Sequence, residues 1–139
     1  TEVEMIEKKH RIDDALEAVG SAQEEGIVTG GGTALLRATK GLKVETDNED
    51  QKLGVRIILE AVEEPLRQMA INAGESPDII VTTVKQNRSP YGWDFTKNTT
   101  VDMFECGIID PVKVTRCALQ NAASVASTLI TTNHAIIKT

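Results

Sequence analysis

The chain has 139 residues, enough for one domain with a modest core, and with only 3% aromatic residues that core must be filled by aliphatic side chains and alanine. A net charge of −6, with basic residues interspersed among acidic ones, argues against a nucleic-acid surface. No apolar run approaches the roughly 20 residues that span a bilayer and no secretory signal opens the chain, so we expect a soluble protein without membrane contacts.

Residues 1 to about 25 are predicted to form a charged helix. Thr1 and Glu4 have the spacing of a capping box, and Glu7 with Arg11 has the spacing of a helix-supporting ion pair, as does Glu4 with Lys8. The apolar stripe is thin and consists of Met5, Ile12, Leu16 and Val19. We therefore expect this helix to project from the body or to bridge two parts of a larger molecule.

Asp13 and Asp14 are adjacent acids within this helix. Their side chains point about 100° apart, so only one of them can face a given site. Two solvated acids are the ordinary interpretation, and a carboxylate that positions or activates a water molecule is the alternative. Their spacing does not decide between the two.

Three glycines, Gly30 to Gly32, precede a predicted helix that begins at Thr33. Consecutive glycines let a ligand approach bare backbone, and the amides at a helix start favour anionic groups. The sequence is not a Walker A loop because no Gly-Lys-Ser/Thr follows. A glycine triplet is also often only a tight turn.

The middle of the chain shows three further helical segments. Asn48 and Gln51 open a helix, Pro65 is expected to break or kink it, and Ser76-Pro77 starts a short helix through about Gln86. Gly74 ends the middle segment. The inner faces are expected to carry Leu53, Ile57, Ile58, Ala61 and Val62, then Leu66, Met69, Ala70 and Ala73.

Residues 87–91 are predicted to form a loop and residues 91–95 a short strand or hairpin edge, followed by about one helical turn from Val101 to Cys106. A long helix is then predicted over residues 110–132, with Asp110 as its N-cap ahead of Pro111. Its buried face is expected to carry Val114, Ala118, Ala122, Val125, Ala126 and Leu129, which makes it the central helix of the core. Residues 135–137 are predicted to form a short terminal strand.

Cys106 and Cys117 lack CxxC spacing, and His10 and His134 lie far from them in sequence. A disulfide or half of a metal site is one interpretation of the cysteines. Two reduced, largely buried thiols are the ordinary one. We expect surface histidines and no zinc site.

Several segments are more specific in combination than any one is alone. They are TEVEMIEKKHRIDDAL, EEGIVTGGGTALLRA, NEDQKLGV, EEPLRQMAINAGESP and GIIDPVKVTRCALQNAASVASTLITT. In this order, across essentially the whole chain, the sequence resembles the C-terminal part of the group I chaperonins, the ring-forming family of bacteria and organelles. The resemblance implies a mostly α fold. Residues 1–24 would be the returning helix of the intermediate domain. Residues 25–139 would be the second half of the equatorial, ATP-binding domain, a helical bundle with a short β-hairpin.

The same resemblance implies a set of nucleotide contacts. Gly31 would approach ATP through its backbone, Asp110 would accept hydrogen bonds from the ribose hydroxyls, and Ile108 would pack against the adenine. The family's turn that lines the base corresponds here to Asp94, Phe95 and Thr96. Phe95 is much larger than the alanine usual in the family, so the chain departs from the family at this base contact.

Asp14 matches the family's aspartate that orders the attacking water, whereas Asp13 matches an acidic neighbour without that role. The phosphate loop and the aspartate that binds Mg²⁺ belong to the first half of the equatorial domain in the family, so the resemblance supplies no metal ligand here. Phosphoryl transfer relies on positioning and charge stabilisation. We therefore expect the chain by itself to be catalytically silent.

The implied partners are other chaperonin subunits, seven per ring in the family, with the co-chaperonin and unfolded client proteins bound through an apical domain. Family members commonly pair an acidic residue at the position of Ser76 with an arginine at the position of Arg67 across the two rings, and Ser76 cannot form this pair. A single ring is therefore an alternative to the double ring.

The expected function is that of a piece of an ATP-dependent protein-folding chaperonin. The alternative is a non-enzymatic helical scaffold or oligomerisation module. The resemblance implies a cytoplasmic protein, bacterial or phage-encoded, with the mitochondrial matrix or plastid stroma as the alternative.

Overall fold

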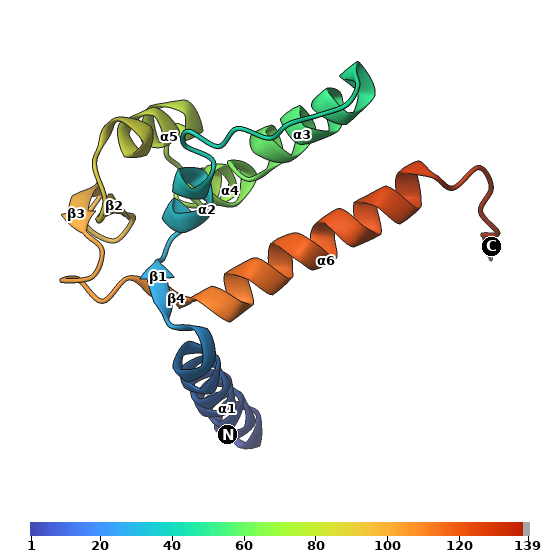
Figure 1. The fold of residues 1–139 in the computed structure, drawn as a ribbon. Helices are drawn as coiled ribbons and strands as arrows, with labels where there is room; N and C mark the ends of the chain where they lie inside the picture. Colours follow the sequence, from blue (N-terminus) through green and yellow to red (C-terminus); the bar gives the residue numbers. More distant parts are fainter. Residues whose placement is uncertain (138–139) are drawn as a thin grey trace.

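A computed structural model describes residues 1–137 of the chain, and most of them are helical, as the sequence predicts (Figure 1). The helices are α1 (Glu2–Glu25), α2 (Thr33–Ala38), α3 (Glu49–Ala61), α4 (Glu64–Asn72), α5 (Pro77–Gln86) and α6 (Val112–Ile130). The strands are β1 (Ile27–Thr29), β2 (Tyr91–Asp94), β3 (Thr99–Asp102) and β4 (Ile109–Pro111). Strands β1 and β4 pair antiparallel, and β2 and β3 form a hairpin.

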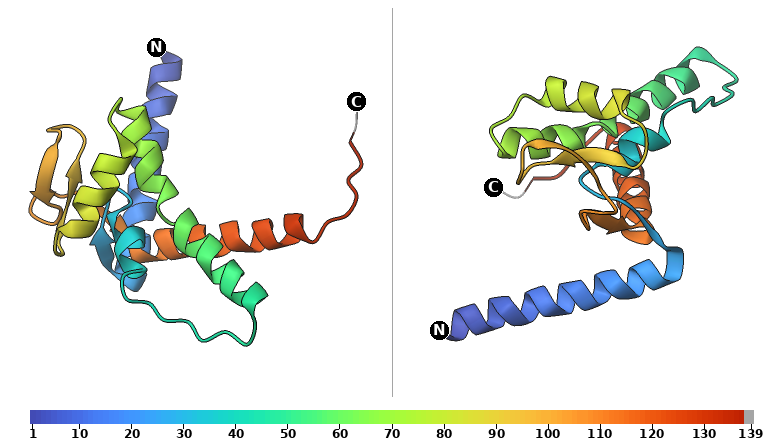
Figure 2. Two further views of the ribbon diagram at one scale, coloured as in Figure 1. Left: turned by 90° about the horizontal axis from the view of Figure 1, so that it is seen from above. Right: turned by 90° about the vertical axis from the view of Figure 1, so that its left-hand side faces the viewer.

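Helix α1 projects from the rest of the molecule, and none of its residues is buried (Figures 1 and 2). The predicted capping box is present, since the Thr1 hydroxyl accepts from the Glu4 amide at 3.2 Å. The predicted pair of Glu7 and Arg11 lies at 3.8 Å. The helix ends at Gly26, whose φ of 83° suits glycine.

The core lies between α2, α4 and α5. It consists of Leu36, Leu66, Ala70, Ile80, Val81 and Val84, and Trp93 and Phe95 of the hairpin region pack against it. The helix boundaries around it follow the predicted signals: the Asn48 side chain accepts from the Gln51 amide at 2.8 Å, and Pro65 stands in the first turn of α4, after the break from α3. Capping and proline chemistry thus place the helices that build this core.

The prediction that the last helix is the centre of the core is wrong for this structure. Helix α6 has no buried residue, and Val125 and Leu129 of its apolar stripe are 59% and 68% exposed. In Figure 1 and in the left view of Figure 2 it extends away from the body beyond its first turns, and no residue of the stripe is buried within residues 1–137. Similarly, the stripe of α3 is exposed at Leu53, Ile57 and Ile58, and only Val62, just after the helix, is buried.

Two further local predictions fail, and a third holds only in part. Asp110 belongs to β4 and Pro111 is the N-cap of α6, without a side-chain cap bond, because pairing with β1 keeps the chain extended through Pro111. The helical turn predicted from Val101 to Cys106 begins later than expected, since hairpin pairing holds Val101 against Gly92 in β3. The turn itself is present, because the Cys106 amide donates to the Asp102 carbonyl at 3.0 Å. Residues 135–137 form no strand.

Cys106 is exposed and Cys117 half-buried, and both thiols are free, so the expectation of two largely buried thiols is wrong for Cys106. His10 and His134 are exposed, as expected. None of the helices within residues 1–137 is both long and apolar enough to cross a membrane.

Candidate functional site

The pairing of β1 with β4 brings the glycine triplet next to the segment before α6. Val28 lies opposite Asp110, and Thr29 lies opposite Ile109. The Gly30 amide then donates to the Ile108 carbonyl at 2.9 Å, and the Val112 amide donates to the Gly26 carbonyl at 3.1 Å. Two segments that are distant in sequence are therefore fixed side by side by backbone hydrogen bonds.

Gly31 is the one glycine of the triplet at which neighbouring atoms leave room for a side chain. A Cβ at Gly32 would come within 3.0 Å of the Leu66 backbone, so side chains are excluded there by contact with α4. At Gly31 the nearest atom would be Met103 Cε at 3.4 Å, an ordinary contact, with Ile108 Cγ2 at 4.0 Å. Its φ of 61° still favours glycine. Gly31 thus exposes bare backbone beside Ile108.

Asp110 carries a half-buried carboxylate in the same place. Burial raises the pKa of the Asp110 carboxyl group above its ordinary value. Within residues 1–137 no hydrogen bond to this carboxylate is described, whereas its backbone is held by β1. A partly desolvated carboxylate without a donor is suited to accept hydrogen bonds from the hydroxyl groups of a ligand.

Asp94, in contrast, already has its partners. The residue is 6% exposed, and its Oδ1 accepts from the amides of Thr96 at 2.8 Å and Lys97 at 3.3 Å. The Lys97 ammonium lies 3.8 Å from Oδ2. The side chain therefore stabilises the turn between β2 and β3, and the Thr96 side chain lies exposed on that turn.

Phe95 packs against the core cluster, together with Trp93. The phenyl ring that replaces the smaller residue expected from the resemblance is thus accommodated on the core side of the hairpin. The hairpin nevertheless reaches the glycine triplet, because the Trp93 carbonyl oxygen would lie 4.0 Å from a Cβ at Gly31.

Sequence reasoning did not anticipate the packing behind the site. A Cβ at Gly92 would come within 2.6 Å of Met103 Sδ and 2.7 Å of Thr33 Oγ1, and both of these side chains are fully buried. A glycine inside a predicted strand signals such a close approach, so Gly92 was the available clue. This contact fixes the hairpin against the start of α2.

Asp14 lies apart from these residues. Its side chain is exposed in the middle of α1, and the helix advances about 16 Å between Asp14 and Glu25, at 1.5 Å per residue. The side-chain hydrogen bonds described between α1 and α6 lie at the far end of α1, at Glu24 and Glu25. The structure therefore brings together Gly31, Ile108 and Asp110, with the hairpin beside them, but not Asp14.

The chemistry of this cluster is that of a binding site. It offers bare backbone, an aliphatic side chain and an acceptor for hydroxyl groups, which suit a ligand with vicinal hydroxyls and a flat apolar ring. Within residues 1–137 no group of three or more His, Cys, Asp and Glu side chains could hold a metal ion.

The sequence was also compared with models of protein families. The family model described as the TCP-1/cpn60 chaperonin family matches residues 1–139. The match includes α1, both segments of the candidate site and α6.

Proposed function

Because the chain belongs to the TCP-1/cpn60 chaperonin family, we propose that it forms one side of the ATP site in a ring-forming chaperonin that assists protein folding. The observation that carries the proposal is the β1–β4 pairing, which places Gly31, Ile108 and Asp110 next to one another. The family match supports the chaperonin role. The arrangement of these residues supports the proposal that the ligand is a nucleotide.

Each residue of the cluster has a distinct part in the proposed site. The Asp110 carboxylate accepts hydrogen bonds from the ribose hydroxyls, and its lack of a described donor leaves it available for them. Ile108 provides an apolar wall for the adenine, and Gly31 lets the nucleotide approach the backbone. The Asp94 turn borders the base, with the Asp94 carboxylate holding the turn in shape.

Asp14 is proposed to act only in the assembled chaperonin, where it would orient the water that attacks the γ-phosphate. In this structure it lies on α1, which is joined to β1 at Gly26, a residue with space around it. Hydrolysis also requires groups that bind the phosphates and Mg²⁺. The candidate cluster does not include them.

Nucleotide binding to the chain tests the proposal directly. Trp93 is the only tryptophan and lies in the hairpin beside the site, so its fluorescence is a local reporter during titration with ATP or adenosine. We expect Asp110→Asn to weaken binding about tenfold, since a charge-assisted hydrogen bond contributes roughly 1.5–3 kcal/mol. Asp50→Asn, on exposed α3, is the matched control. Equal affinity of the wild-type chain and Asp110→Asn would refute the ribose assignment.

A hydrolysis assay distinguishes an ATP-hydrolysing chaperonin from a non-enzymatic helical module. The exposed position of Asp14, apart from the candidate site, is compatible with either function. The chain alone should show no Mg²⁺-dependent hydrolysis above background. In an assembled chaperonin ring containing this sequence, Asp14→Ala should slow single-turnover hydrolysis severely and preserve ATP binding, while Asp13→Ala should change neither. Assembled rings that bind but never hydrolyse ATP would favour the module.

Ring number is a further part of the proposal. Arg67 forms ion pairs inside the chain, with Asp78 at 2.6 Å and Glu63 at 3.7 Å, while Ser76 offers no carboxylate. We therefore favour a single ring. Electron microscopy of the assembled protein tests this, and Ser76→Glu should increase the proportion of double rings. Double rings in the unaltered protein would contradict it.

A further inference from the structure

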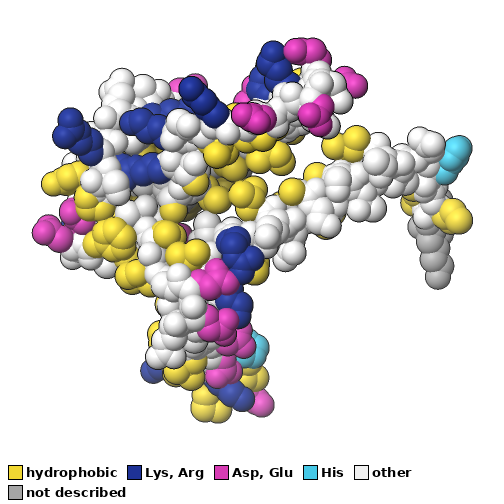
Figure 3. Space-filling view, in the orientation of Figure 1, with side chains coloured by type: hydrophobic (Ala, Val, Ile, Leu, Met, Phe, Trp, Pro, Cys, Tyr) yellow, Lys and Arg dark blue, Asp and Glu magenta, His cyan; other side chains and the backbone are white. Residues whose placement is uncertain are grey.

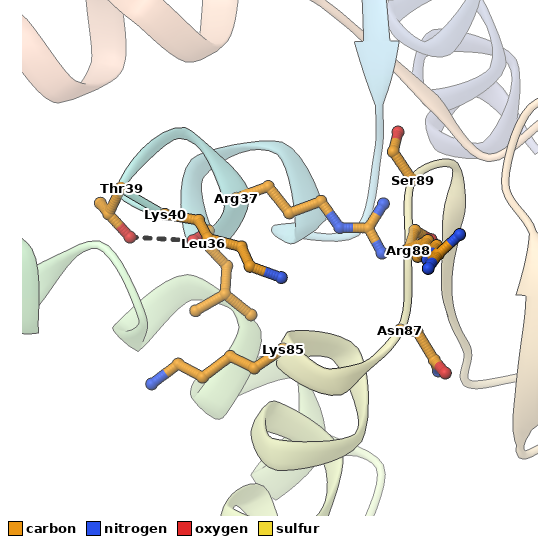
Figure 4. A pocket seen from close by; sticks show the side chains of 8 residues that line it. All are labelled: Leu36, Arg37, Thr39, Lys40, Lys85, Asn87, Arg88 and Ser89. Atoms are coloured by element: carbon orange, nitrogen blue, oxygen red, sulfur yellow. Dashed lines mark hydrogen bonds between the residues drawn. The ribbon is translucent and has the colours of Figure 1, made fainter. Parts of the chain in front are cut away.

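A separate hollow of about 590 Å³ lies at the C-terminal end of α2, away from the glycine triplet at its other end (Figure 4). It is formed by the end of α2, the end of α5 and the loop before β2. The lining residues are Leu36, Arg37, Thr39, Lys40, Lys85, Asn87, Arg88 and Ser89. Its volume lies within the range of roughly 300–1,000 Å³ that is typical of small-molecule sites.

The lining carries cationic side chains and no carboxylate. Lys85 has a partner, because its ammonium group lies 2.5 Å from Glu63, and in Figure 4 it points away from Arg88. No ion pair within residues 1–137 is described for Arg37, Lys40 or Arg88. In an acidic protein of net charge −6, this is a local excess of positive charge. Figure 3 shows several Lys and Arg side chains gathered over α5 and the neighbouring hairpin.

Arg37 is held rigidly in this hollow. Its Nη2 donates to the backbone carbonyls of Arg88, at 3.1 Å, and of Tyr91. Its Nη1 is buried and has no acceptor, and burial lowers the pKa of the guanidinium group. Within residues 1–137 no carboxylate is described against this guanidinium group, so Arg37 contributes an uncompensated positive charge to the wall of the hollow, which favours an anion there.

We propose that this hollow binds a small phosphorylated anion. Arg37, Lys40 and Arg88 supply the positive charge, and Leu36 provides an apolar floor for the part of the ligand that carries no charge. Phosphate oxygens suit the site because the exposed guanidinium group of Arg88 can donate to them in pairs, while Arg37 and the ammonium group of Lys40 contribute positive charge. The proposal is independent of the ATP site, since it uses none of the residues assigned there.

Isothermal titration of the chain with inorganic pyrophosphate tests the proposal. We expect saturable binding that weakens as salt is added. The double variant Lys40→Gln/Arg88→Gln should lose at least tenfold in affinity. Both residues lie at the surface and hold no described core contact, so the far-UV circular dichroism of this variant should match that of the wild-type chain. Lys8→Gln/Lys9→Gln on exposed α1 is the matched control, because it removes two positive charges elsewhere.

The remaining outcomes each oppose the proposal. No saturable binding, or an equal loss of affinity in the α1 control, would overturn it. Displacement of pyrophosphate by adenosine, or a loss of pyrophosphate binding in Asp110→Asn, would place the anion in the ATP site instead. Binding of an acidic peptide without binding of pyrophosphate would assign the hollow to a protein partner.

Discussion

The region built from α2, α4, α5 and the hairpin differs sharply from the two longest helices, α1 and α6. The first region contains the buried core, in which Leu66, Ala70 and Val84 have no exposed surface. The long helices have no buried residue, although α6 carries a clear apolar stripe. Figure 3 shows hydrophobic side chains exposed along α6. An apolar stripe therefore specifies a helix, whereas burial of that stripe requires a surface that faces it.

Oppositely charged side chains also pair between the two long helices at their bases. Arg116 Nε donates to Glu25 at 3.0 Å, and Lys113 pairs with Glu24 at 2.5 Å. The hydrogen bond from Arg116 lowers the pKa of the Glu25 carboxyl group. Polar contacts of this exposed kind are weak and sensitive to salt. Added salt should therefore weaken the contacts at the helix bases and leave the packing of the core unchanged.

The largest expected contrast comes from removing the same side chain in the two regions. Leu66→Ala in the core should lower the free energy of unfolding by about 2–5 kcal/mol, because it leaves a cavity. Leu129→Ala in α6 removes an equally large side chain from a residue that is 68% exposed. This substitution should change the free energy of unfolding by less than about 0.5 kcal/mol. Urea denaturation followed by circular dichroism measures both. Comparable losses would show that α6 is packed in solution.

A smaller contrast comes from adding one methyl group. Gly92→Ala forces a Cβ to within 2.6 Å of Met103 Sδ and should destabilise the chain by about 1–3 kcal/mol. Gly54→Ala, inside α3, meets no atom within 4 Å and should stabilise the chain by roughly 0.5–1 kcal/mol. Thermal melts should therefore show a lower melting temperature for Gly92→Ala and a higher one for Gly54→Ala than for the wild-type chain. A stabilising Gly92→Ala would refute the close packing of the hairpin on α2.

Asp110 should give a modest effect that depends on pH. Because burial raises its folded-state pKa, the folded chain favours the protonated carboxyl group, and the ionised form is a net cost that develops as the pH rises above the unfolded-state pKa. Asp110→Asn should therefore raise the melting temperature at pH 7, and the difference from the wild-type chain should shrink towards pH 3. A melting temperature of Asp110→Asn that is lower than that of the wild-type chain at pH 7, and that approaches it towards pH 3, would mean that the carboxylate has a stabilising partner.

The smallest effect is expected at the helix bases. The lowered pKa of Glu25 means that its pairing with Arg116 contributes stability above the unfolded-state pKa, and that this contribution is lost as the pH falls through the folded-state pKa. Arg116→Gln should therefore lower the melting temperature slightly at neutral pH and low salt. The difference should disappear in concentrated salt. A difference that persists there would show that packing, and not charge, joins α1 to α6.

Local chemistry in the sequence determined much of this protein. The capping box at Thr1, the cap at Asn48 and the prolines at 65 and 77 set helix boundaries that the structure confirms, because each acts within one helical turn. The ordered motifs indicated the family, and the match over the whole chain confirmed it. The residues of the candidate site were named from that resemblance, and their roles stay predictions.

Tertiary structure decided what no local signal could. Asp110-Pro111 has the sequence of a helix start, but pairing with β1 extends it as a strand, and the partner residues lie far away in the sequence. Gly31 and Ile108 are neighbours only because that pairing forms. The stripe of α6 predicted a core helix, yet burial depends on which surfaces meet, and within residues 1–137 none covers it. Periodicity identifies the face that a helix would bury, and only the arrangement of the other elements determines whether that face is buried.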